Sequence, residues 1–233
     1  MSQDRKKFKM PPKRYHPKGL TILYEDHDVI VIDKASGLLS VSTSTEKDLT
    51  VYALLSEYVK KSDSKSRNKV HVVHRLDQYT SGVLILAKTE QAKNYLQTNW
   101  KSFSKIYNAV VAGRLQNQEG EITSYLTENK SYKVYSVSDE ALGRFSKTKY
   151  KVLKETDEYS FVEIDLLTGR KNQIRVHFAD IGNPVLGDIV YGTKQKEIPR
   201  LMLHASKFKF THPITQQEMV FEAPLPVEFN KFT

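Results

Sequence analysis

Hydrophobic and polar positions alternate in GEITSYLT (120–127) and KTKYKVLKE (147–155), with the two-residue period of strands that are buried on one face. Near the start of the chain, polar residues 25–28 separate two apolar segments that predict strands, TILY and VIVID, and a further turn follows at Gly37. The apolar run VLILA (83–87) predicts a strand buried on both faces. The pattern predicts further strands at 104–113, 120–127, 147–155, 159–167, 201–213 and 218–224.

Three segments have helical spacing instead. Thr50 or Asp48 is suited to cap a helix that carries Val51, Leu54, Leu55, Tyr58 and Val59 on one side. Thr89 begins a second helix, with Ala92, Tyr95 and Leu96. The third runs from 173 to a C-capping Gly182. Strands outnumber helices and mostly follow one another directly, which predicts an α+β fold: a mixed, largely antiparallel sheet with a few flanking helices. We expect one folded domain at 20–233, preceded by a basic, flexible tail at 1–19.

Composition narrows the class of protein. The chain has 233 residues, of which 39% are hydrophobic, so it can bury a substantial core. The absence of cysteine excludes disulfides, thiol nucleophiles and cysteine-ligated zinc, and it fits a cytoplasmic protein. No apolar run approaches the roughly 18 residues of a membrane span, and the N-terminus has no signal-like segment, so we expect no membrane association.

The net charge of +9 is concentrated in two segments. Residues 1–20 contain seven Lys or Arg against one acid, Asp4, and residues 60–71 contain five against Asp63. Two basic segments on a nearly neutral body favour a polyanionic partner such as nucleic acid. Either segment taken alone is equally consistent with a solubilising function.

Chemically versatile side chains gather in three places: HRLDQYTSG (74–82), SKIYNAVVAG (104–113) and the segment from 166 to 192. The sequence contains no glycine-rich nucleotide motif and no nucleophile elbow. His71 and His74 have too few companion ligands to predict a metal site, so we expect an enzyme without cofactor or metal. Within a helix at 173–182, Gln173 and His177 share a face, whereas Arg175 is free to meet a carboxylate from another element.

Together these motifs resemble the RluA family of pseudouridine synthases. The resembling segments occur in the family's order and cover roughly 20–222: YEDHDVIVIDKASGLLSV, HRLDQYTSG with VLILAK, SKIYNAVVAG, TGRKNQIRVHFADIGNPVLGDIVYG and LHASKFKFTHP. The resemblance implies the pseudouridine synthase fold with a central catalytic cleft, and a cofactor-free isomerisation of uridine in rRNA or tRNA by a monomeric protein. It also implies a short form of the family, without the small N-terminal RNA-binding domain of many relatives.

By motif match, the resemblance implies roles for individual residues. Asp77 would be the nucleophile, acting on the sugar, on the base or through a glycal, and Arg75 would enter the stack that the target base leaves. Tyr107 would stack on the flipped uracil and help remove its proton, and Arg175 would pair with Asp77. Three more residues are candidates for substrate contact: Leu203 against the uracil face, Arg170 as a phosphate-facing or structural residue, and His74.

Three positions depart from the family's pattern. Ala35 and Ser42 stand where proline is usual, which predicts a softer loop, and Asn172 stands where histidine is common. Two alternatives stay open: a catalytically silent RNA-binding or RNA-folding protein on the same fold, and an unrelated basic protein with a nucleic acid as a surface partner.

Overall fold

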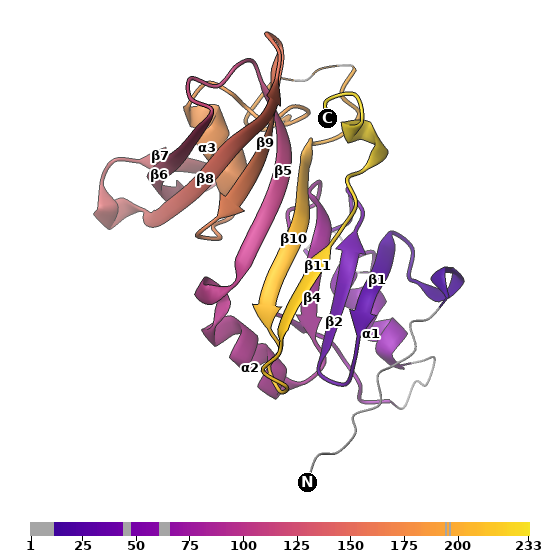
Figure 1. Cartoon of the computed structure of the whole chain (residues 1–233). Helices are drawn as coiled ribbons and strands as arrows, with labels where there is room; N and C mark the ends of the chain where they lie inside the picture. Colours follow the sequence, from indigo (N-terminus) through magenta and orange to yellow (C-terminus); the bar gives the residue numbers. More distant parts are fainter. Residues whose placement is uncertain (1–11, 44–47, 61–65, 194, 196) are drawn as a thin grey trace. The chain divides into compact units, whose positions relative to one another are not determined.

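The computed structural model describes residues 12–43, 48–60, 66–193, 195 and 197–233 (Figure 1). The chain forms two compact units. One comprises residues 1–103 and 208–223, and the other comprises 104–207 and 224–233. Strand β10 (Leu203–Thr211) carries the chain from the second unit into the first. Whether the two units form one domain at 20–233, as predicted, depends on how they join, so this stays a prediction. Most of the basic tail (1–11) and part of the basic loop (61–65) lie outside the described residues.

Antiparallel strands form the first unit. β1 (Leu20–Glu25) pairs with β2 (Val29–Lys34), β2 pairs with β4 (Ser81–Ala87), and the short β3 (His71–Val72) also pairs with β4. β11 (Glu218–Glu222) pairs with β10. All seven residues of β4 are buried, as the run VLILA predicted. The turn predicted at residues 25–28 joins β1 to β2.

Two α-helices and two short 3₁₀ helices complete this unit. α1 (Val51–Lys60) begins after Thr50, whose hydroxyl accepts from the N–H of Ala53 at 3.2 Å, so Thr50 rather than Asp48 makes this capping bond. α2 (Glu90–Thr98) is capped by Thr89 as predicted. The 3₁₀ helices are η1 (Lys13–Tyr15) and η2 (Trp100–Ser102). Apolar residues of β2, β4 and α2 meet the aromatic rings of Phe103, Phe208 and Phe210 in the core.

The second unit is built on a longer antiparallel ladder. β5 (Ser104–Ala112) pairs with β9 (Tyr159–Leu166), β9 with β8 (Arg144–Glu155), β8 with β6 (Glu119–Glu128), and β6 with β7 (Val134–Val137), and these strands lie side by side in Figure 1. Burial alternates along β8, as its sequence predicts. β7 was not predicted, because its four residues are too few to show a period. Its hairpin begins at Asn129, whose side chain accepts from the N–H groups of Ser131 and Lys133, each at 3.0 Å.

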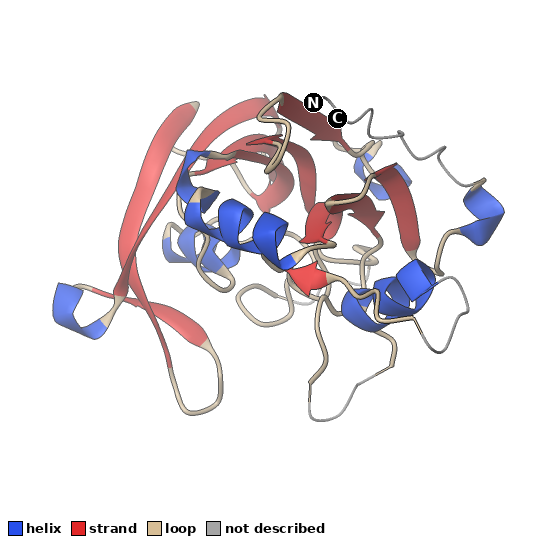
Figure 2. Cartoon of the chain, turned by 90° about the horizontal axis from the view of Figure 1, so that it is seen from below, coloured by secondary structure: helices blue, strands red, loops and turns tan. Residues whose placement is uncertain are grey.

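Helix α3 (Gln173–Asp180) contacts β6, β7 and β8. It was predicted from 173 to a C-capping Gly182, and Gly182 indeed adopts a left-handed conformation with φ of +83°. Two further 3₁₀ helices, η3 (Glu140–Leu142) and η4 (Val227–Phe229), lie in this unit. Figure 2 shows strands as the predominant element. The antiparallel ladders with a few helices confirm the predicted α+β class. Among the described residues, no helix is both long and apolar enough to span a membrane.

Candidate active site

Asp77 is the first residue of a tight turn that precedes β4. The N–H of Thr80 donates to the carbonyl oxygen of Asp77 across 3.1 Å, which closes a four-residue turn. Just before the turn, the hydroxyl of Ser40 donates to the carbonyl oxygen of Leu76 at 2.7 Å and accepts from the N–H of Leu76 at 3.1 Å. The backbone on both sides of Asp77 is therefore fixed, while Asp77 itself is only half-buried.

A buried lysine ties the loop after β2 to this turn. Lys34 is 0% exposed, and its ammonium group donates to the carbonyl oxygens of Ala35 at 3.0 Å, Leu38 at 2.8 Å and Gln78 at 3.0 Å. An ammonium group has three N–H donors, so these acceptors match its full capacity. Sequence reasoning did not single out Lys34. The available signal was a lysine at the end of the strand VIVIDK, which begins with four apolar residues.

Further hydrogen bonds join the same loop to the residues after Asp77. The N–H of Gly37 donates to the carbonyl oxygen of Gln78 at 2.9 Å, and the Gln78 side chain donates back to that of Gly37 at 3.1 Å. The hydroxyl of Ser36 donates to the carbonyl oxygen of Tyr79 at 2.7 Å. These bonds hold the loop that contains Ala35, and the softer loop predicted from this position stays a prediction.

His74 and Arg75 precede Asp77 in different environments. The Nε2 atom of His74 accepts from the N–H of Ile85 at 3.3 Å, and its ring packs on Trp100 and Phe208, with centroids 4.4 and 5.8 Å apart. Arg75 is exposed. Within the described part of the chain, its guanidinium group has no hydrogen bond or ion pair. Arg75 is therefore available to an anion, whereas substrate contact by His74 stays a prediction.

In the second unit, Tyr107 lies on β5 opposite Ile164 of β9 and is 8% exposed. Lys105 lies two residues earlier on the same face of the strand and is 6% exposed. Burial lowers the pKa of Lys105, and the charge of Asp165 opposes that shift in part. Sequence reasoning treated Lys105 only as a neighbour of Tyr107. Because Lys105 is buried on the same face of β5 as Tyr107, Lys105 is a second candidate site residue on this strand.

Arg175 is held by a cage of side chains from its own unit. Its Nε and Nη2 atoms donate to the two carboxylate oxygens of Asp188 at 2.6 and 2.9 Å, and its Nη1 donates to the side-chain oxygen of Asn172 at 2.9 Å. The Tyr191 ring lies 5.1 Å from the centre of the guanidinium group. Burial would raise the pKa of Asp188, but the hydrogen bond and charge of Arg175 outweigh burial and lower that pKa.

The prediction that Arg175 meets a carboxylate from outside its helix holds for Asp188, which sequence reasoning had not identified. The Asp188 side chain is 0% exposed, so this pair is a buried, bidentate one. Asp77 belongs to the first unit and Arg175 to the second. The predicted pairing of these two residues stays a prediction.

Asn172 occupies a backbone position that favours its residue type. It immediately precedes α3 with φ of +54°, in the left-handed region where asparagine is several-fold enriched. Its amide nitrogen donates to the hydroxyl of Tyr191 at 3.1 Å, while its oxygen accepts from Arg175. Asn172, at the position where histidine was expected, therefore contacts both Arg175 and Tyr191.

Gln173 and His177 share a face of α3, as predicted. Both contact the hydroxyl of Thr148 on β8, the Gln173 amide nitrogen at 2.9 Å and His177 Nδ1 at 2.8 Å. His177 Nε2 also lies 3.0 Å from the hydroxyl of Ser124 on β6. Burial lowers the pKa of His177 to about 4, so this imidazole is neutral at physiological pH. This network anchors the helix that carries Arg175.

The two remaining candidates lie in the second unit. Leu203 is the first residue of β10 and is 3% exposed. Arg170 is exposed, and its Nε donates to the carbonyl oxygen of Phe145 at 3.3 Å. Their contacts with substrate stay predictions.

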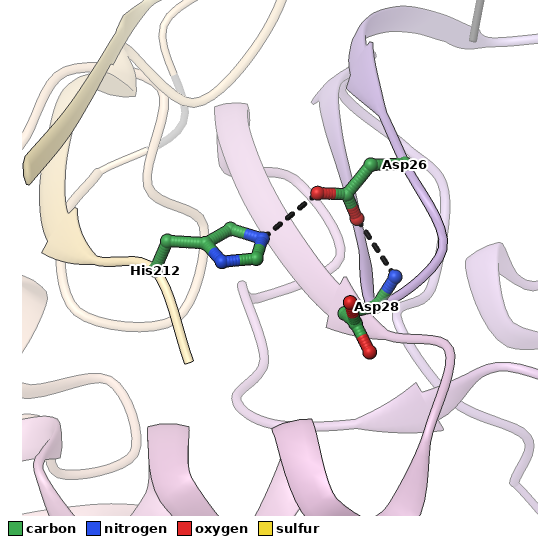
Figure 3. A group of neighbouring side chains, drawn as sticks. All are labelled: Asp26, Asp28 and His212. Atoms are coloured by element: carbon green, nitrogen blue, oxygen red, sulfur yellow. Dashed lines mark hydrogen bonds and ion pairs between the residues drawn. The ribbon is translucent and has the colours of Figure 1, made fainter. Parts of the chain in front are cut away.

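One group of side chains in the first unit has the composition of a metal site: Asp26, Asp28 and His212 (Figure 3). His212 Nδ1 accepts from the N–H groups of Ile214 and Thr215 at 3.2 and 3.1 Å, so its proton is on Nε2, which lies 2.8 Å from Asp26. Burial would raise the pKa of Asp26, but hydrogen bonds from His212 and the backbone lower it to about 2. His212 therefore uses both ring nitrogens within the protein, and the cluster fastens the β1–β2 turn to the end of β10.

Residues 28–180, which include Asp77, Tyr107 and Arg175, match the family described as RNA pseudouridylate synthase. This match covers well over half of the chain. The chain belongs to the RNA pseudouridylate synthase family. It is therefore an RNA-modifying isomerase, and RNA is its partner.

Relatives of this synthase match it over most of its length. The uncharacterised RNA pseudouridine synthase YhcT of Bacillus subtilis is 34% identical, over 91% of this chain and 70% of its own. The dual-specificity RNA pseudouridine synthase RluA of Haemophilus influenzae is 33% identical, over 88% and 92%. The structure of human RNA pseudouridylate synthase domain containing 4 shares the fold, with a TM-score of 0.74, 24% identity and 90% of each chain covered. These likenesses confirm the resemblance drawn from the motifs.

Proposed function

We propose that this synthase isomerises specific uridines in structured rRNA or tRNA, with Asp77 as the nucleophile. In this isomerisation the bond from the sugar C1′ to N1 of uracil breaks and a bond from C1′ to C5 forms. The proton leaves C5 and N1 gains one, so atoms and electrons balance without an oxidant or a cofactor. A carboxylate suits the reaction because it can add covalently and leave again. Addition to the sugar, addition to the base and a glycal route all use the same carboxylate.

The observation that carries this proposal is the way the turn at Asp77 is held. The residues on either side of Asp77 form hydrogen bonds with Lys34, Ser36, Gly37 and Ser40, while Asp77 itself remains half-buried. A surface turn with an ordinary ion pair needs no such support. A nucleophile does, because a misplacement of about 1 Å can reduce a rate by roughly 100-fold.

We assign the following roles to the other site residues. The target nucleotide leaves its stack, since a base inside a helix cannot be reached, and Arg75 enters the space. Tyr107 stacks on the flipped uracil and assists removal of the C5 proton, while Leu203 packs against the ring. Arg175 pairs with Asp77 and keeps it ionised. The cage of Asp188, Asn172 and Tyr191 supports this part because it fixes the guanidinium group in one orientation.

We further infer that the protein acts in the cytoplasm as a monomer, and that its basic N-terminal segment supplies long-range attraction to phosphates. The alternative of a catalytically silent RNA-binding protein on the same fold has a direct test. Pseudouridine is mapped in total RNA from cells with and without this gene, which gives the activity and the target together.

Complementing the deleted strain with variants tests the nucleophile. Asp77→Asn removes the ionised carboxylate and is expected to abolish modification while leaving RNA binding nearly intact, because removal of a nucleophile costs many orders of magnitude in turnover. Asp157→Asn is a matched control, since Asp157 is exposed and forms a surface ion pair with Arg114. Turnover by Asp77→Asn at even about a hundredth of the normal rate would exclude the nucleophile assignment.

A further inference from the structure

Tyr79, two residues after Asp77, carries an exposed aromatic ring on the same tight turn. The residue is 47% exposed, and among the described residues its side chain makes no hydrogen bond, ion pair or ring contact. A single exposed aromatic residue is common on protein surfaces. The position of this one, beside the proposed nucleophile of an RNA-modifying enzyme, distinguishes it from the others.

The backbone beneath this ring is fixed. The carbonyl oxygen of Tyr79 accepts from the hydroxyl of Ser36 at 2.7 Å, and that of Gln78 accepts from both Lys34 and Gly37. The bond from Thr80 to Asp77 closes the turn around it. A tyrosine has only two side-chain torsions, so a ring on an immobile turn loses little entropy when it binds a flat partner.

A cation accompanies the ring. Arg75 is exposed and has no protein partner among the described residues. The same short segment therefore offers a cation that can bind an anion and an aromatic ring that can stack on a flat ring. A phosphodiester next to a nucleobase has this chemistry. Proteins bind unstacked nucleotides through aromatic rings and basic side chains together.

We propose that the Tyr79 ring is a stacking platform for an RNA base that neighbours the target uridine. Two residues of chain span at most about 7 Å, so the ring lies within reach of a nucleotide one or two positions from the flipped one. When the target leaves the stack, Arg75 enters the vacated space, and the Tyr79 ring stacks on a flanking base that this rearrangement exposes. This subsite rests on the proposed function, since it takes Asp77 as the point where the target uridine sits.

The test compares Tyr79→Ala, which removes the ring, with Tyr79→Phe, which keeps it. The matched control is Tyr135→Ala, because Tyr135 is 45% exposed and belongs to β7 of the other unit. The probe is the RNA fragment that contains the mapped target, with 2-aminopurine placed in turn at each position within two nucleotides of the target. Stacking on a ring quenches this fluorophore. Binding is measured in the Asp77→Asn background and turnover in the wild-type background.

We expect Tyr79→Ala to weaken RNA binding about ten-fold and to raise KM similarly, with kcat changed less than about two-fold. Quenching is lost at one flanking position only. Tyr79→Phe and Tyr135→Ala behave as wild type, and all variants melt at the wild-type temperature. The proposal is overturned by wild-type binding of Tyr79→Ala, by a Phe variant as weak as the Ala variant, or by quenching that no variant changes. If Asp77→Asn keeps its turnover, the nucleophile assignment fails separately, because the binding series does not depend on chemistry.

Discussion

Replacing Lys34 with methionine tests the central claim about how Asp77 is positioned. Methionine has an unbranched side chain of similar length but provides no donor, so the carbonyl oxygens of Ala35, Leu38 and Gln78 lose the ammonium group. The oxygen of Gln78 retains the N–H of Gly37. Two carbonyl groups in this loop are thus left without the donor that the wild-type protein provides.

The expected loss of stability follows from those two groups. Each unsatisfied carbonyl costs about 1–2 kcal/mol, which gives about 2–4 kcal/mol for the pair. Removal of a buried charge offsets part of this, because an ammonium group that is 0% exposed bears a desolvation cost in the wild-type protein. In a domain of this size, the net effect corresponds to a melting temperature lower by roughly 5–10 °C.

Turnover is expected to fall as well as stability. Without Lys34 the turn at Asp77 loses one of its ties to the loop after β2, and we expect kcat to fall by about 100-fold well below the melting temperature, with KM little changed. The assay is single-turnover pseudouridine formation, alongside thermal melting. Lys154→Met is the control, because Lys154 donates to a single carbonyl oxygen, that of Thr233, at the surface. A Lys34→Met enzyme with wild-type kcat would refute the positioning argument.

Three further outcomes are expected. In urea, Asp188→Asn should lose about 3–5 kcal/mol of unfolding free energy, because it removes the charged, bidentate partner of a buried arginine; Glu121→Gln, which breaks an exposed pair with Lys147, should lose less than about 1 kcal/mol. The pKa of His177 is about 4 when folded and 6.5 in its ordinary range, so the folded state binds fewer protons between these values and loses stability as the pH falls through them. Between pH 7 and pH 5 the unfolding free energy should fall by about 2 kcal/mol in the wild-type protein, and denaturant titrations of His177→Gln should not show this fall. If the unfolding free energies of both proteins depend equally on pH, a group other than His177 causes the effect. Deleting residues 1–18 should flatten the logarithmic salt dependence of RNA binding by roughly three units if about half of the charges contact phosphate, and the modified uridine should stay the same; an unchanged slope would make the tail a solubilising appendage only.

Local structure was predictable from the sequence because local forces determine it. The run VLILA predicted a strand buried on both faces, and Thr89 predicted the start of α2. The four-residue spacing of Gln173 and His177 placed both on one face of α3, where each contacts Thr148. In each case the interaction that determines the structure lies within one helix or strand, or between that element and the strands it packs against.

The supports of the site could not be predicted in the same way. Lys34 and Gln78 lie 44 positions apart, and nothing in the local pattern around either residue indicates the other. Asp188 is only 13 positions from Arg175, yet it lies in an irregular segment after α3 that has no period to place it. Such partners are determined by the path of the chain in space, so sequence reasoning named Arg175 without Asp188 and named neither Lys34 nor Gln78 as a support of the turn.

Each unit fixes its own reactive group by internal hydrogen bonds. In the first unit, backbone carbonyl groups around Asp77 are held by an ammonium group and two serine hydroxyls. In the second unit, Arg175 is held by a carboxylate, an amide and an aromatic ring. The backbone at Asp77 and the guanidinium group of Arg175 are thus held by the protein itself, and in the proposed mechanism this reduces the reorganisation that accompanies the reaction. The proposed mechanism also requires extraction of the uridine from its stack. We assign that step to the exposed residues beside Asp77, Arg75 and Tyr79, which are in contact with solvent.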